Sequence, residues 1–94
     1  MPTQQFLVVS YDVVSDSRRR KVMKTMEGFG QRVQYSVFEC LLTPAQVLEM
    51  QRKLKKLVSE EDSVRFYSIS ADDVKRIGVL GSGDVTRDRV FIML

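Results

Sequence analysis

Apolar side chains fill the first segment of the chain, from Phe6 to Val13, with little polar interruption before its end. Such a run predicts a strand that is covered along most of its length and therefore lies inside a sheet. Its polar end, Ser10-Tyr11-Asp12, leads into Ser15-Asp16-Ser17. Because Ser and Asp are favoured at helix N-caps, we expect a helix to begin at Asp16 or Ser17.

The helix predicted after this turn has one apolar stripe. Val22, Met26 and Phe29 recur at spacings of four and three residues, which places them on one buried face. Gly28 and Gly30 are expected to end the helix, because glycine is favoured just beyond a helix C-terminus.

Residues 32–42 alternate between apolar and polar, as strands do, but the phase changes inside the run. Val33, Tyr35 and Val37 carry the first alternation, and Phe38 begins the second. A phase change within a strand predicts a bulge, a kink or a very tight hairpin.

The second half of the chain again predicts a helix followed by a strand. Thr43-Pro44 is expected to begin a helix, with Pro in its first turn. The remaining predictions are a buried stripe of Val47, Met50, Leu54 and Leu57, a strand over 64–69, a short helical turn capped at 70–73, a glycine loop over 78–83 and an apolar last strand over 89–94.

These elements follow the order β-α-β-β-α-β plus one terminal strand, which is the ferredoxin-like arrangement of an α+β protein. We expect a single domain over residues 1–94, because the chain is too short for two cores. Two helices cover only one face of the antiparallel sheet, so a second copy packed sheet to sheet is the simplest cover for the other. The strand over 89–94 is then expected to pair with the partner's sheet edge. The alternative is that it folds back on its own sheet.

Composition restricts the chemistry more than it restricts the fold. The chain has no His, so catalysis would use carboxylates, Tyr, Ser, Arg, Lys or a hard cation. A lone Cys, Cys40, gives no reason to expect an oxidising compartment, and we expect a cytoplasmic protein. No apolar run approaches the ~20 residues that cross a membrane.

The charge of the chain is mildly basic. Lys plus Arg number 15 against 12 acids, a net charge of +3, which permits a nucleic-acid partner without requiring one.

Asp12 is the first candidate for chemistry. It lies at the end of a hydrophobic strand, where a central strand delivers a side chain to the rim of the sheet. A carboxylate there is a plausible ligand for a hard cation, and a two-fold dimer would bring two copies of Asp12 together around Mg²⁺. The alternative is that Asp12 merely caps the following turn.

A basic run at the start of the first helix is the second candidate. Arg18-Arg19-Arg20-Lys21 stands where positive charge opposes the helix dipole, so a functional use such as phosphate contact is indicated. Lys24 and Arg32 add to this charge. The alternative is an ordinary solvated helix face.

Phe38 is the third candidate, because it stands where the strand changes phase and could point outward. An exposed aromatic beside basic residues can stack on a base. The alternative is that Phe38 belongs to the core or to a dimer interface.

These residues together resemble the CRISPR-associated protein 2 family. The resemblance covers essentially the whole chain. Its most specific part is the segment Arg32-Val33-Gln34-Tyr35-Ser36-Val37-Phe38; Tyr11-Asp12-Val13, Asp16 and Arg19-Arg20 also match.

The resemblance implies ferredoxin-like homodimers in which a terminal strand completes the partner's sheet. Members take part in acquiring CRISPR spacers, where the dimer bridges two dimers of the CRISPR integrase and duplex DNA lies across its basic surface. Several members were assigned a Mg²⁺-dependent endonuclease activity on single-stranded RNA or duplex DNA. By this resemblance Asp12 is a metal ligand and catalytic, Tyr11 is its catalytic neighbour, and Arg19, Arg20, Lys21, Arg32 and Phe38 contact nucleic acid.

Three functions follow as hypotheses. The first is a metal-dependent endonuclease, an endoribonuclease or DNase, that uses Asp12 of both subunits. The second is a non-catalytic DNA-binding scaffold, which the sparse catalytic equipment of a chain without His favours. The third, a small-ligand regulatory module of the same fold, is disfavoured because no glycine-rich ligand loop follows a strand.

Overall fold

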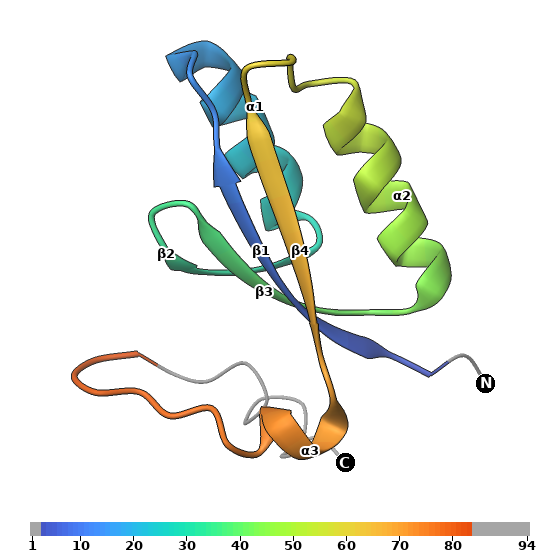
Figure 1. Ribbon diagram of the computed structural model, residues 1–94, viewed down its shortest axis with the longest axis vertical. Helices are drawn as coiled ribbons and strands as arrows, with labels where there is room; N and C mark the ends of the chain where they lie inside the picture. Colours follow the sequence, from blue (N-terminus) through green and yellow to red (C-terminus); the bar gives the residue numbers. More distant parts are fainter. Residues whose placement is uncertain (1–2, 84–94) are drawn as a thin grey trace.

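A four-stranded antiparallel sheet with two long helices on one face forms the domain (Figure 1). The computed structural model describes residues 3–83. Its elements are β1 (Gln5–Asp12), α1 (Asp16–Glu27), β2 (Gly30–Gln34), β3 (Val37–Leu42), α2 (Pro44–Lys55), β4 (Ser63–Ile69) and α3 (Ala71–Val74). The predicted ferredoxin-like order is therefore confirmed, and the strand predicted over 89–94 lies outside the described residues. No helix within the described part of the chain has the length and hydrophobicity to cross a bilayer.

The first strand lies inside the sheet, as its apolar run predicts. The spatial order is β2-β3-β1-β4, and β1 pairs with both β3 and β4. On the helix side, Leu7, Val9 and Tyr11 of β1 are buried in the main core cluster. This cluster also contains Val22 and Met26 of α1, Met50 and Leu54 of α2, and Phe38, Cys40 and Leu42 of β3.

The phase change in residues 32–42 is a tight hairpin with a bulge. Tyr35 and Ser36 form the turn between β2 and β3, and the pairing register shifts between Arg32 and Gln34. Gly30 is required at the start of β2, because a Cβ there would lie 2.5 Å from the sulfur of Cys40. The two strands are therefore close at this end, and their pairing register shifts at the bulge.

Both long helices begin at the predicted caps. The Ser15 side chain accepts a hydrogen bond from the backbone N–H of Arg18, which fixes the start of α1. Thr43 and Gln46 form a reciprocal capping box at α2, with Pro44 in its first turn. These caps satisfy backbone N–H groups that the helices leave without a partner.

The second face of the sheet has no helix of the length of α1 or α2 over it within residues 3–83. Its side chains alternate with the core residues, so Val8, Ser10 and Asp12 of β1 share this face with Arg65 and Tyr67 of β4. The segment 77–83 lies along its β2–β3 part and lines a groove of about 490 Å³ there. We call this side of the sheet the open face.

Candidate nucleic-acid interface

Asp12 is an exposed carboxylate at the end of β1. It lies on the open face and pairs in register with Ser63 of β4. Its side chain accepts no hydrogen bond and forms no ion pair with any described residue. The alternative that Asp12 caps the following turn is not what the structure shows, because Asp62 accepts the hydrogen bond from Val14 in that turn and Ser15 caps α1.

The turn after Asp12 is held by a residue that the sequence analysis did not identify. Asp62, with a side chain that is 0% exposed, accepts hydrogen bonds from the backbone N–H of Val14 at 2.9 Å and from Arg18 Nε at 3.0 Å. It also accepts one from the backbone N–H of Ser59 at 2.9 Å. The Arg18 guanidinium and these backbone donors hold the pKa of Asp62 well below its usual range. Arg18 of the basic run is therefore used to fix this turn.

One chain offers few ligands for a metal ion. Within residues 3–83, no three His, Cys, Asp or Glu side chains gather where they would hold a cation. Mg²⁺, however, is usually bound by only one or two carboxylates and keeps several waters. Asp12 fits such an ion only if a second carboxylate comes from elsewhere, and an exposed, unpaired side chain on the open face is available to a second copy.

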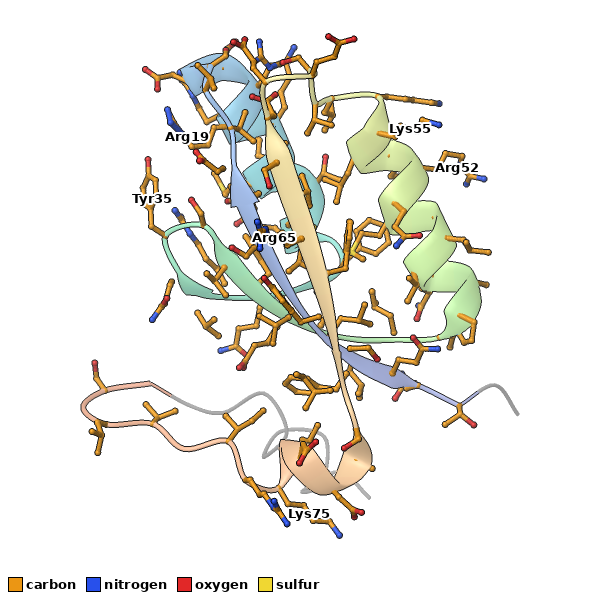
Figure 2. All side chains as sticks on the ribbon, in the orientation of Figure 1. Arg19, Tyr35, Arg52, Lys55, Arg65 and Lys75 are labelled. Carbon is orange, nitrogen blue, oxygen red and sulfur yellow. The ribbon has the colours of Figure 1, made fainter. Side chains whose placement is uncertain are left out.

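Three arginines surround a pocket on the other side of the sheet. The pocket has a volume of about 380 Å³ and lies between α1 and the β2–β3 hairpin. Figure 2 shows Arg19 and Tyr35 at one lateral edge of the molecule and Arg52 and Lys55 of α2 at the opposite edge. The lining residues are Tyr11, Asp16, Arg19, Arg20, Met23, Arg32 and Tyr35. We call this site the arginine pocket.

Tyr11 lies at the inner end of the arginine pocket. Its side chain is only 4% exposed, and its ring stacks on Phe38 with the centroids 6.3 Å apart. Its hydroxyl is buried and has no hydrogen-bond partner in the part of the chain that the structure describes. Burial raises the pKa of Tyr11, so the phenol stays protonated and is a potential donor.

Arg32 holds Tyr35 at the rim of the pocket. Its Nε and Nη2 donate to the Tyr35 carbonyl oxygen at 3.0 and 2.8 Å, and its guanidinium carbon lies 5.0 Å from the Tyr35 ring centroid. The Tyr35 side chain is nevertheless 72% exposed. Tyr35 is thus a fixed, exposed aromatic beside positive charge, and its place in the hairpin turn was the signal that could have identified it.

The structure brings together some of the predicted contact residues and separates others. Arg19, Arg20 and Arg32 line one pocket, whereas the exposed Lys21 is not part of its lining. Phe38 is 0% exposed and packs in the core. The prediction that Phe38 contacts nucleic acid is therefore wrong in this fold, because the strand resumes with Phe38 on the helix side after the hairpin.

Comparison with known proteins identifies the family. The model of the family described as CRISPR associated protein Cas2 matches residues 5–77. The chain belongs to the Cas2 family. A Synechocystis protein named CRISPR-associated endoribonuclease Cas2 3 is 44% identical over 81 residues, which is 85% of this chain and 88% of that one. A Thermus thermophilus CRISPR-associated endoribonuclease Cas2 is 40% identical over 83 residues, covering 87% and 88%. The resemblance inferred from the residues is confirmed.

Solved Cas2 structures share the fold. Streptococcus pyogenes Cas2 at pH 6.5 superposes with a TM-score of 0.72 at 38% identity, covering 81% of this chain and 99% of that one. A chain of a partial Cas6-RT-Cas1–Cas2 complex superposes with a TM-score of 0.72 at 30% identity, covering 81% and 90%. The ferredoxin-like domain of this Cas2-family chain is therefore shared with a protein that was solved together with Cas1.

Proposed function

We propose that this Cas2-family protein is a metal-dependent endonuclease of CRISPR spacer acquisition that acts as a homodimer through Asp12 of both subunits. One observation carries the proposal: Asp12 is an exposed carboxylate without a partner among residues 3–83, at the end of a central strand and on the open face. A charged side chain in that position is available to a second chain, to a cation or to both.

The homodimer is supported by the composition of the open face. Val8 of β1, Leu41 of β3 and Ile69 of β4 are half-buried on this face, whereas Phe6 of β1 is already buried within the chain. An apolar sheet face needs cover, and a second identical sheet supplies it without a new partner. Asp12, at the end of β1, would then stand where two subunits meet.

Mg²⁺ is the ion that this arrangement suits best. The two Asp12 carboxylates of a dimer would hold it, with waters and substrate oxygens completing its coordination. When bound, the ion would supply Lewis acidity and a more acidic water at the phosphodiester. The protein side chains would bind and orient the strand: Arg19, Arg20 and Lys21 by phosphate contacts, and Tyr35 by stacking on a base.

A scaffold that binds DNA without cutting it is the second candidate. It is favoured because, within residues 3–83, no group of three His, Cys, Asp or Glu side chains that could hold a metal ion includes Asp12. The structural likeness to a chain from a Cas1–Cas2 complex is consistent with this function. In that function the dimer would bridge Cas1 integrase dimers, and the basic side chains of α1 would follow the backbone of duplex DNA.

Cleavage assays with Asp12→Asn separate the two functions. With Mg²⁺ and either single-stranded RNA or duplex DNA, the endonuclease hypothesis predicts cleavage by the wild type, none by Asp12→Asn and normal cleavage by the control Asp72→Asn on α3. Equal cleavage by wild type and Asp12→Asn would remove Asp12 from the chemistry. Full spacer acquisition in cells with Asp12→Asn would favour the scaffold.

A further inference from the structure

The arginine pocket contains a buried group, Tyr11, to which the proposed nuclease assigns no contact. The side chains of Tyr11 and Asp12 alternate across the sheet, so the pocket lies on the helix side and Asp12 on the open face. Within one chain, a group bound against Tyr11 is therefore separated from Asp12 by the sheet. A group bound in the pocket is therefore a different group from one bound at Asp12 of the same chain.

The charge of the pocket favours a doubly negative ligand. Its lining carries three arginines and one carboxylate, Asp16, which leaves two positive charges. Arg19 is oriented by an ion pair with Asp16, and Arg32 by its bonds to the Tyr35 carbonyl. Arg20 forms no ion pair with a described residue. Guanidinium groups fixed in this way bind phosphate oxygens through several N–H donors at once.

The Tyr11 hydroxyl identifies the inner end of the site. It is a buried polar group without a partner among residues 3–83, in a side chain that is 4% exposed and contributes to the lining of the pocket. Buried hydroxyls are nearly always hydrogen-bonded, so an orphan of this kind indicates a missing acceptor. Because this oxygen has almost no accessible surface, an acceptor reaches it only at the bottom of the pocket and with a small shift of the neighbouring side chains.

The depth and the volume of the arginine pocket favour a terminal phosphate over a phosphate in the middle of a strand. A phosphodiester has to leave the site in two directions, whereas a phosphate monoester needs only one. The volume of about 380 Å³ has room for more than a phosphate ion, and the exposed Tyr35 ring stands at its rim for a base to stack on.

We propose that the arginine pocket binds the phosphate monoester of a nucleotide, with the Tyr11 hydroxyl donating to the phosphate, the arginines neutralising it and Tyr35 stacking on its base. The phosphate belongs to a free nucleotide or to the end of a nucleic-acid strand. That the ligand is the end of a nucleic-acid strand rests on the proposed function, whereas the binding of a phosphate monoester in the pocket does not. If the pocket binds the end of a nucleic-acid strand, the protein holds that strand at a defined point relative to Asp12.

Calorimetric titration of the dimer with inorganic phosphate and with 5′-AMP tests the pocket. Tyr11→Phe keeps the ring that packs on Phe38 and removes only the donor, so both ligands should bind about tenfold more weakly. Arg20→Gln should weaken both by a similar factor. The matched controls, Tyr67→Phe on the open face and Arg52→Gln on α2, should bind as the wild type does. Absence of saturable binding, or equal binding by Tyr11→Phe and wild type, overturns the proposal.

Oligonucleotides then distinguish the source of the phosphate. Tighter binding of a strand with a 5′- or 3′-phosphate than of the same strand with hydroxyl ends, lost in Tyr11→Phe, identifies a strand end. AMP binding with no preference between phosphate and hydroxyl ends identifies a free nucleotide. Repeating the titrations with Asp12→Asn separates this proposal from the nuclease, because the pocket is expected to bind normally whether or not Asp12 cleaves.

Discussion

The side chains of Tyr11 and Asp12, adjacent in the chain, lie on opposite faces of the sheet. Tyr11 is buried among the helices at the end of the arginine pocket, and Asp12 is exposed on the open face. The Arg19 guanidinium links the two electrostatically: its pKa is raised mainly by the hydrogen bond to Asp16 and, to a smaller extent, by the charge of Asp12. The sheet thus separates a proposed metal ligand from a proposed phosphate site.

Replacement of the two aromatics of the hairpin should affect different properties, RNA binding for Tyr35 and stability for Phe38. Tyr35→Ala removes an exposed ring and should weaken binding of single-stranded RNA by about tenfold, with little change in stability. Phe38→Ala empties a core position and should lower the free energy of unfolding by about 3–5 kcal/mol. Chemical denaturation and fluorescence-anisotropy binding measure the two effects. Normal RNA binding by Tyr35→Ala would remove Tyr35 from the interface.

Asp62 should be necessary for the stability of the turn that carries Asp12. Asp62→Ala removes the acceptor of the Arg18 Nε–H and of the backbone N–H of Val14, so the free energy of unfolding should fall by about 2 kcal/mol. The exposed Asp72→Ala on α3 is the control and should change it by less than about 0.5 kcal/mol. Equal stability of both variants in urea denaturation would contradict the account of this turn.

Acid should weaken the fold through Asp62. Because the pKa of Asp62 is lower in the folded chain than its ordinary 3.8, its ionised form contributes stability that is present above that value and is lost as the pH falls toward the folded pKa. The free energy of unfolding of the wild type should therefore decrease below about pH 4, and Asp62→Asn should show a shallower decrease. Denaturant titrations from pH 6 to pH 2.5 test this; parallel curves for the two proteins would be inconsistent with it.

Binding of duplex DNA should depend steeply on salt through the basic residues of α1. Each phosphate contact contributes about 0.9 to the slope of log K against log salt concentration. Lys21→Gln should lower this slope by about one and weaken binding equally for all sequences. A Lys75→Gln control at the C-terminal end of α3 should leave the slope unchanged. If Lys21→Gln behaves like this control, Lys21 does not contact the backbone.

The local pattern of the sequence was sufficient for the fold. The apolar run of β1 and the caps Ser15 and Thr43 predicted elements that the structure contains, because each depends on neighbours within a few residues. The phase change predicted a hairpin or a bulge, and both occur there. The phase change could not decide whether Tyr35 or Phe38 would face outward, because a shift of one residue in the pairing register moves every side chain to the opposite face of the strand.

The candidate site depends on contacts that no local pattern shows. Asp62 is 48 residues from Val14, to which it bonds, and 44 from Arg18. The arginine pocket likewise needs α1 beside the β2–β3 hairpin. Period-two alternation alone, by contrast, would have separated Tyr11 from Asp12. The family resemblance pointed to Asp12, and the fold assigned it to the open face.

Metal binding by the dimer tests the central claim most directly. Mn²⁺ serves as a spectroscopic substitute for Mg²⁺, and its binding is counted by electron paramagnetic resonance on samples whose mass is measured by sedimentation. The account predicts one ion for two wild-type chains, none for Asp12→Asn and one for the control Asp72→Asn, with all three proteins dimeric. One ion in each chain, or undiminished binding by Asp12→Asn, would contradict a site shared by the two Asp12 carboxylates.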